Sequence, residues 1–249
     1  MQEENGNIMD NRLLELRGLT RKYRLRTAVD NVDLVLERGK TCALLGPNGS
    51  GKTTLMKTIT GLVKPTSGEI LLEGKPLTWR SREKIAYMPT ENYFYTYMTI
   101  RDAKNFYRDF YADFSTDRFE QMLSRMELDE KASIRQLSSG MSAKLRLALA
   151  LAREAELIML DEPLNGVDIL TRYQVIQEIR QRRENSRTML LSTHLVEELD
   201  EVIDMAIYMH NGCVERVVSR EELNGESYTG IYLKIYGERE VQHAETAEG

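Results

Sequence analysis

The sequence predicts an α/β fold with an antiparallel β subdomain and an inserted helical lobe. Three observations lead to this fold. The first segments alternate apolar and polar residues as half-buried strands do, a glycine-rich turn joins a short apolar run to a helix, and strands alternate with helices in the second half. We expect one domain over residues 11–237, with the lobe inserted at about 91–154 and flexible ends at 1–10 and 238–249.

Period-two alternation and short apolar runs define the expected strands. The run 157–160 is apolar throughout and bounded by charge, which suits a strand covered on both faces. The segment 228–236 also alternates in a strand-like way, but no role for it is evident. The expected strands are 13–16, 29–36, 41–45, 69–72, 85–88, 157–160, 188–191 and 205–209.

Apolar residues at helical spacing define the expected helices. The pattern between residues 99 and 127 accommodates two helices, and Ser115 is a natural N-cap for the second of them. The other expected helices are 52–60, 139–154, 169–184 and 195–201.

The composition is that of an ordinary globular protein. The 249 residues are 41% hydrophobic and 29% charged, and no apolar run approaches the ~20 residues that cross a bilayer. The N-terminus lacks the basic and apolar regions of a secretory signal, and two cysteines are a poor disulfide framework, so we expect a cytosolic location. A net charge of −5 argues against general nucleic-acid binding, and no nucleic-acid partner is expected.

The glycine-rich turn carries the strongest functional signal. It follows the expected strand 41–45 and opens the helix 52–60, so its N–H groups and the positive helix end would face one concavity. Lys52 would reach the β- and γ-phosphates, and the Thr53 hydroxyl would hold Mg²⁺. The pattern predicts a nucleoside triphosphate site formed by Gly46, Pro47, Asn48, Gly49, Ser50, Gly51, Lys52, Thr53 and Thr54.

Two carboxylates follow the buried strand 157–160 and complete a candidate hydrolytic site. Asp161 would lie beside the metal held by Thr53, and Glu162 would act as general base toward a water molecule. His194 follows the next expected strand, at the edge where ligands gather in open α/β sheets. Taken by itself, His194 fits a cap for the following helix equally well.

A further polar turn opens the helix that begins near residue 139. Ser138 and Ser139 are natural helix caps, and Gly140 would let a phosphate from a partner approach the backbone. These residues alone also fit an ordinary capped helix start.

Taken together and in this order, the motifs resemble those of the nucleotide-binding subunits of ABC transporters, over about residues 13–209. The turn at 46–54 resembles the Walker A loop, and 157–162 resembles Walker B with its catalytic glutamate. Residues 137–141 are similar to the signature Leu-Ser-Gly-Gly-Gln. The remaining matches are the D-loop at 165–168 with Asp168, the switch histidine at His194, and Tyr23 where the family places an aromatic residue that stacks on adenine.

The resemblance implies a mechanism. Two such domains close head to tail, and each ATP, with Mg²⁺, lies between Walker A of one and the signature of the other. The partner would be a second copy (a homodimer) or another ATPase subunit (a heterodimer), and cargo would cross through separate transmembrane permease subunits. The chain would lie peripherally on the cytoplasmic face of the cell membrane. The residues implied to act in trans are Ser138, Ser139, Gly140 and Met141.

Two departures from the family pattern stand out. The family usually places glutamine after Tyr-x-Pro, where it touches the metal and water, but here Thr90 and then Glu91 follow. Thr90 is too short to replace a glutamine, so Glu91 or water substitutes, or coupling to the permease is altered. The signature has Ser139 for its first glycine and Met141 for its glutamine.

An aromatic cluster follows the first departure directly. Exposed aromatic side chains serve as interface anchors, so we interpret the cluster as a socket for a short helix of the permease. The alternative is a satellite core under the helical lobe. The cluster consists of Tyr93, Phe94, Tyr95 and Tyr97.

The form of the signature and the short chain look most like the exporter branch, whose members export drugs, peptides or lipid-like substrates. The alternative function is a soluble ABC ATPase that remodels a protein or ribosome complex. A P-loop kinase or GTPase fits less well, because it would need neither the signature nor Glu162 together with His194.

Overall fold

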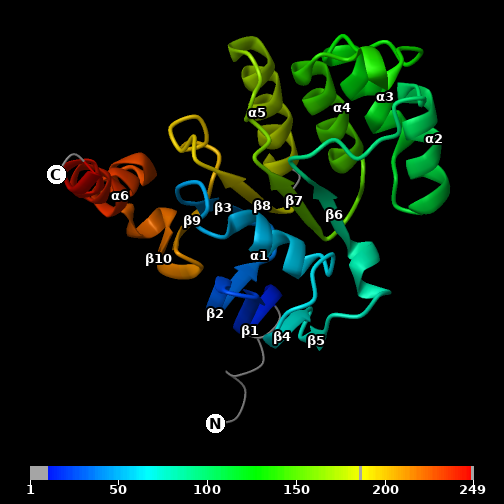
Figure 1. Ribbon diagram of the computed structural model, residues 1–249. Helices are drawn as coiled ribbons and strands as arrows, with labels where there is room; N and C mark the ends of the chain where they lie inside the picture. Colours follow the sequence, from blue (N-terminus) through cyan, green and yellow to red (C-terminus); the bar gives the residue numbers. More distant parts are fainter. Residues whose placement is uncertain (1–10, 185–186, 248–249) are drawn as a thin grey trace.

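The computed structural model describes residues 11–184 and 187–247, and a six-stranded sheet forms its centre. The strand order is β10-β9-β3-β8-β7-β6, in which neighbours are parallel except for the antiparallel pair of β9 and β10 (Figure 1). The strands are β3 (Thr41–Leu45), β6 (Ile85–Met88), β7 (Leu157–Asp161), β8 (Thr188–Thr193), β9 (Met205–His210) and β10 (Cys213–Ser219).

A second, wholly antiparallel sheet has the order β2-β1-β4-β5 and lies below the central sheet in Figure 1. Its two long strands extend beyond the alternating segments at 13–16 and 29–36, because pairing continues to the hairpin tip, where Tyr23 faces Arg26. The hairpin therefore carries both side chains out toward the phosphate loop. The strands are β1 (Arg12–Tyr23), β2 (Arg26–Glu37), β4 (Ser67–Leu72) and β5 (Lys75–Pro76).

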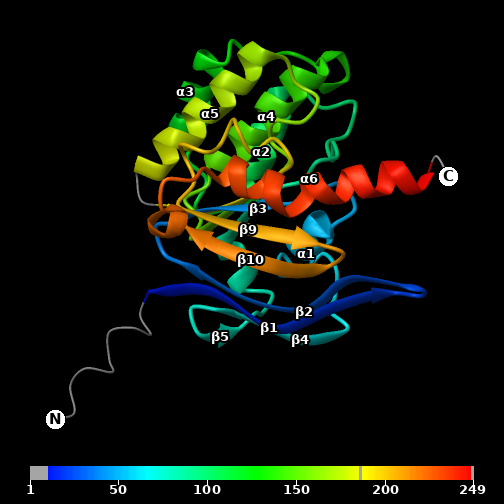
Figure 2. The same cartoon turned by 90° about the vertical axis from the view of Figure 1, so that its left-hand side faces the viewer.

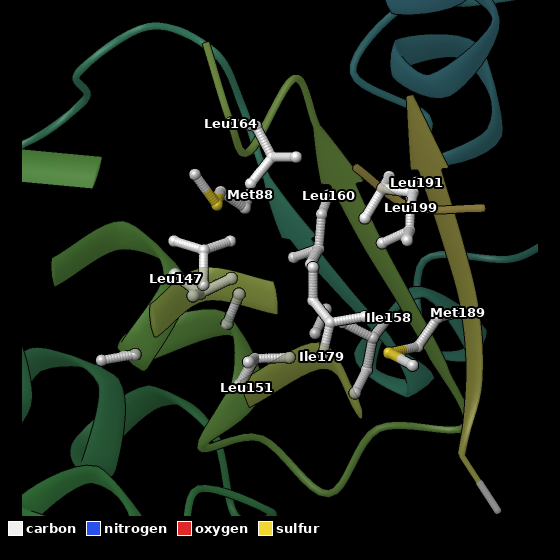
Figure 3. Close-up of a cluster of buried hydrophobic side chains, with 14 of the residues drawn as sticks. Met88, Leu147, Leu151, Ile158, Leu160, Leu164, Ile179, Met189, Leu191 and Leu199 are labelled. Atoms are coloured by element: carbon white, nitrogen blue, oxygen red, sulfur yellow. The ribbon is translucent and has the colours of Figure 1, made fainter. Parts of the chain in front are cut away.

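The central sheet is buried on both faces, and β7 shows this most clearly. Ile158 and Leu160 join the core on the side of the helical lobe, whereas Leu157 and Met159 join the core shared with the antiparallel sheet. Figure 3 shows Ile158 and Leu160 among buried side chains from the lobe and from β8. The continuous apolar run is thus explained by cover on both faces, as predicted.

Helices cover the two faces unequally. Helix α1 (Lys52–Ile59) packs between the two sheets, and four helices gather above the central sheet in Figure 1. Ser115 caps the second lobe helix as predicted, since its side chain accepts a hydrogen bond from the Arg118 N–H. The four helices are α2 (Ile100–Phe110), α3 (Thr116–Arg125), α4 (Ser139–Leu151) and α5 (Ile169–Glu184), and short 3₁₀ turns lie at Ser81–Lys84, Ile134–Gln136 and Arg220–Leu223.

Two secondary-structure predictions are wrong. The segment 195–201 forms turns rather than a helix, because its backbone closes short bonds such as Leu199 N–H to the Val196 carbonyl. The segment 228–236 is not a strand but the start of α6 (Tyr228–Ala247). Its buried residues Tyr228, Ile231 and Tyr236 recur at helical rather than alternating spacing.

Helix α6 lies against the edge of the central sheet near β9 and β10 (Figure 2). The Tyr208 hydroxyl donates to the Tyr228 carbonyl at 3.0 Å, and the Tyr236 hydroxyl donates to the Met209 carbonyl at 3.1 Å. Residues 238–247 continue this helix, so the flexible C-terminal end stays a prediction there, and residues 1–10, 248 and 249 lie outside the described part of the chain.

We expect Leu160→Ala to lower the free energy of unfolding by about 2–5 kcal/mol, because a fully buried side chain would leave a cavity. Urea denaturation measures the change. Leu233→Ala is the matched control, since Leu233 is 60% exposed and its loss should change stability by less than ~0.5 kcal/mol. Equal losses in the two variants would contradict the assigned packing.

Candidate nucleotide-binding site

Three adjacent parallel strands end at one edge of the central sheet and build the site. β8 pairs with β3 on one side and with β7 on the other, with Leu45 opposite Thr193 and Asp161 opposite Ser192. The loops that follow the three strands therefore meet at their carboxyl ends. This arrangement brings together the glycine-rich turn, the two carboxylates and His194, which the sequence placed far apart.

Glycine is required where the phosphate loop presses on neighbouring backbone. Gly51 has φ 109°, and a Cβ atom there would lie 2.3 Å from the Ala28 carbonyl oxygen. A Cβ on Gly46 would lie 2.2 Å from the Met209 carbonyl oxygen. Larger side chains would push the loop away from both strands and distort the cradle.

Lys52 is held inside the loop, 6% exposed. Its ammonium donates to the carbonyls of Gly46 at 2.8 Å and Pro47 at 3.2 Å, and lies 3.5 Å from Glu162 Oε1. Burial lowers the pKa of Lys52, and the nearby Glu162 carboxylate opposes this shift. A cation removed from water in this way is suited to an anionic phosphate.

Asp161 is fully buried at the end of β7 and is surrounded by hydroxyl groups. Ser192 donates to Asp161 Oδ1 at 2.5 Å and Thr53 donates to the same oxygen at 3.2 Å. Tyr87 donates to Oδ2 at 3.2 Å. The carboxylate stays buried because these hydroxyl groups replace its hydration.

Thr53 and Asp161 fit a magnesium site. Mg²⁺ is bound through one or two carboxylates, with phosphate oxygens and water filling the other positions. Within residues 11–184 and 187–247, no cluster of three or more His, Cys, Asp or Glu side chains could hold a metal ion. The Ser50 hydroxyl in the same loop is buried without a hydrogen-bond partner, and a ligand oxygen would satisfy it.

Glu162 and His194 lie together beside the phosphate loop. Glu162 Oε2 is 3.1 Å from His194 Nδ1, and the Glu162 side chain is 9% exposed. Its backbone is left-handed at φ 49°, and its N–H donates to the Ser192 hydroxyl at 2.9 Å. Such strain in a residue other than glycine is typical of functional positions. The carboxylate thus lies between His194 and Lys52.

A cavity of about 440 Å³ opens in front of the loop, within the size range of ligand pockets. Gly46, Pro47, Asp161 and His194 flank this cavity without lining it. Its lining residues are Tyr23, Arg26, Ala28, Asn48, Gly49, Ser50, Gly51, Lys52, Thr53, Thr54, Thr90, Glu162 and Asn165.

Tyr23 stands at the mouth of the cavity, 42% exposed. The Arg21 guanidinium lies 4.2 Å from the centre of its ring, so one face is covered by a cation. Arg26 donates to the Gly49 carbonyl at 2.7 Å. This hydrogen bond links the tip of the β1–β2 hairpin to the phosphate loop. A nucleotide base stacked on the Tyr23 ring would therefore lie next to a phosphate loop that Arg26 holds in place.

The turn at residues 137–141, called the signature turn below, lies apart from this cavity. Ser138 caps α4 by accepting a hydrogen bond from the Met141 N–H at 3.2 Å, and Ser138 and Ser139 are exposed. Gly140 packs near Asp168, whose carboxylate accepts bonds from the Thr171 N–H at 3.0 Å and hydroxyl at 2.8 Å. Those bonds lower the pKa of Asp168.

Thr90 and Glu91 point in different directions. Thr90 lines the cavity, and its hydroxyl donates to the Asp161 carbonyl at 3.4 Å. Glu91 instead pairs with Lys57 on α1 at 3.0 Å, and it is not among the lining residues. Of the two proposed substitutes for the missing glutamine, Glu91 is therefore engaged elsewhere, and water remains.

Sequence reasoning assigned no role at the site to Tyr87, Ser192 or Arg26, and it named Asn165 only within the D-loop range. Only Ser192 left a signal, as a polar residue at the end of an apolar strand directly before Thr193 and His194.

Comparisons with known proteins identify the family of this chain. The family described as ABC transporter matches residues 29–165. The chain belongs to the ABC transporter family. The ABC transporter ATP-binding protein YtrB of Bacillus subtilis (strain 168) is 31% identical over 226 residues, which cover 90% of this chain and 76% of YtrB.

Two further likenesses extend the comparison. The SkfA peptide export ATP-binding protein SkfE of Bacillus subtilis (strain 168) is 33% identical over 206 residues, 80% of this chain and 86% of SkfE. A solved ATP-binding subunit of an ABC transporter has a TM-score of 0.79 at 27% identity and covers 89% of this chain and 98% of its own. The predicted family, the P-loop fold of the ABC type and ATPase activity are confirmed.

We expect Lys52→Ala in this ABC subunit to weaken Mg–ATP binding about 10- to 100-fold, because a charge-assisted contact to phosphate is lost. Isothermal titration calorimetry measures the affinity. Lys75→Ala is the control, since Lys75 is exposed on β5 and should leave the affinity unchanged. An unchanged affinity in Lys52→Ala would contradict the phosphate site.

Proposed function

We propose that the chain is the ATPase subunit of a peptide exporter and that Glu162 is its general base. One observation carries the catalytic part: the Glu162 carboxylate lies between Lys52 and His194 at the edge of the phosphate cavity. A base in this position is within reach of a water molecule beside the terminal phosphate.

The residues around Glu162 have different roles in the proposed reaction. Lys52 and the loop N–H groups hold the phosphates, and Glu162 accepts the proton of the attacking water. His194 orients Glu162, because its Nδ1 lies 3.1 Å from Glu162 Oε2. Thr53 and Asp161 would hold Mg²⁺, which neutralises charge on the phosphate oxygens.

The position of the signature turn supports a two-subunit arrangement. Ser138 and Ser139 are exposed and do not line the cavity of their own subunit. If they contact a terminal phosphate, it belongs to the nucleotide of another subunit. The partner is then a second copy of this chain or another ATPase subunit, and nucleotide bound at the shared surface holds the pair closed.

The aromatic cluster supports a permease partner. The aromatic cluster is divided: the Tyr93 hydroxyl contacts the Tyr107 hydroxyl at 2.6 Å and Phe94 packs on the lobe core, whereas Tyr95 and Tyr97 are 65% and 79% exposed. Tyr93 and Phe94 therefore fit the core interpretation, and the exposed Tyr95 and Tyr97 are the residues we propose for the socket.

Beside Tyr93 is a cavity of about 400 Å³ between the lobe and α1. Its walls include Leu62, Tyr87 and Tyr111, and they would receive an apolar helix of the permease. No described helix is long and apolar enough to span a bilayer. The similarity to a peptide export protein favours peptide cargo, with the chain attached to the cytoplasmic face of the membrane.

We expect Glu162→Gln to bind ATP but to hydrolyse it about 10²–10⁴-fold more slowly, because the amide cannot accept the proton of water. The trapped nucleotide should hold two subunits together, which sedimentation velocity with and without Mg–ATP detects. Glu201→Gln is the control, with a side chain 85% exposed. Parental turnover in Glu162→Gln would mean that another group is the base.

We expect Tyr95→Ala to keep basal ATPase activity yet to reduce recovery of the permease when the complex is purified from detergent extracts. Tyr173→Ala removes an equally exposed tyrosine from α5 and should leave recovery unchanged. Undiminished recovery of the permease in Tyr95→Ala would argue against the socket. Recovery of the parent chain with ribosomes and no membrane protein would favour the soluble remodelling function.

A further inference from the structure

Arg146 is a buried cation that the proposed reaction does not use. It lies on α4 and is 8% exposed, and no carboxylate among the described residues lies within ion-pair distance of it. Burial lowers the pKa of its guanidinium. Buried arginines are normally paired with acids, because removing a charge from water is costly. One acid, Glu91, interacts with Arg146 electrostatically but forms its ion pair with Lys57.

The partners of Arg146 are three backbone carbonyls, two of which lie outside its own helix. Its Nη1 donates to the carbonyl of Pro89 at 2.8 Å and to that of Thr90, and its Nε donates to Ser142 within α4 at 3.4 Å. The first two carbonyls belong to the segment that leaves β6 toward α2, and this segment passes between the sheet and the lobe (Figure 1). Arg146 therefore links α4 to the segment at residues 89–90, which lies more than 50 residues earlier in the chain.

The same segment and the end of β6 both contact Asp161, the residue proposed to hold Mg²⁺. The Thr90 hydroxyl donates to the Asp161 carbonyl, Tyr87 donates to Asp161 Oδ2, and Thr90 lines the nucleotide cavity. On its outer side Glu91 pairs with Lys57 of α1. The contacts to Asp161 and the carbonyls that accept from Arg146 therefore lie within one short stretch of chain, residues 87–90.

Arg146 also shares a rigid element with the signature turn. Helix α4 begins directly after Ser138, and Arg146 lies about 12 Å further along its axis. Because the intervening residues form continuous helix, a displacement of the Arg146 backbone moves the turn as well.

We propose that Arg146 is a positioning residue that couples nucleotide in the cavity to the placement of the signature turn of the same subunit. The proposal rests on the proposed function, because it assumes that this turn meets the nucleotide of a second subunit. Arg146 touches no reacting atom. It acts by fixing α4 to the carbonyls at 89–90, so that the occupied cavity presents the turn correctly to the partner.

The test uses Arg146→Met in the Glu162→Gln background, since methionine keeps an unbranched chain and removes every donor. We expect the ATP affinity of dilute, monomeric protein to change less than about twofold. The ATP concentration that gives half of the dimer should rise about tenfold, within the usual range of coupling between sites. Calorimetry and sedimentation velocity measure the two quantities separately.

Lys144→Met is the matched control. Lys144 lies on the same helix and donates to the Met126 carbonyl at 3.3 Å, inside the lobe rather than to the segment at 89–90. The Lys144→Met substitution removes a cation from the same helix. It should leave the ATP affinity of the monomer and the ATP concentration for half-maximal dimerisation near their parental values. Arg146→Lys should recover part of the coupling, because one ammonium reaches a single carbonyl.

Hydrogen exchange gives a readout that does not need a dimer. In dilute parent protein, ATP should change the exchange of amides at 138–141, and Arg146→Met should abolish that change while thermal stability stays close to the control. Unaltered dimerisation and exchange in Arg146→Met would overturn the coupling. Equal losses of ATP affinity, dimerisation and stability in Arg146→Met would also overturn it, because they would mean that Arg146 only stabilises the fold.

The same experiment separates this inference from the proposed function. If Glu162→Gln with parental Arg146 stays monomeric at saturating ATP, the two-subunit arrangement is wrong and the coupling falls with it. If that protein dimerises and only the Arg146→Met result fails, the ATPase proposal stands and Arg146 has no part in it.

Discussion

The buried carboxylate of Asp161 fixes the relative positions of the elements that form the site. Its three hydroxyl partners come from different places: Ser192 from β8, Thr53 from α1 and Tyr87 from β6. A fully buried charge is tolerated only when its lost hydration is replaced, so a slip of any one strand would leave it unsatisfied. The register of the sheet and the geometry of the phosphate loop are therefore linked through one side chain.

Local patterns predicted most of the fold and much of the candidate site. The phosphate loop was recognisable because glycine, lysine and threonine are required at fixed spacing between a strand and a helix. Glu162 and His194 were expected at one edge because parallel strands end together, and the structure places them 3.1 Å apart. The segment 228–236 was misjudged because its tyrosines and aliphatic residues satisfy both a strand and a helix pattern over so few positions.

Residues whose roles depend on distant partners left little trace in the sequence. Tyr87 stood out only as the tyrosine of the Tyr-x-Pro pattern, and Arg26 is one of several charges in a basic stretch of the sequence. Arg146 lies among leucines and alanines of α4, and only the fold reveals that it meets carbonyls 56 and 57 residues earlier in the chain. Such contacts depend on tertiary register, which periodicity along the chain does not encode.

The C-terminal helix has a bearing on the phosphate loop that its position in the sequence does not suggest. Tyr236 of α6 donates to the Met209 carbonyl, and that same oxygen is the atom against which Gly46 closes. The first turns of α6 therefore contact the same backbone carbonyl that Gly46 of the phosphate loop packs against. Shortening the chain ahead of Tyr236, or replacing α6 with another protein, would disturb catalysis through the Met209 backbone, although none of the residues that line the cavity in the described part of the chain belongs to the helix.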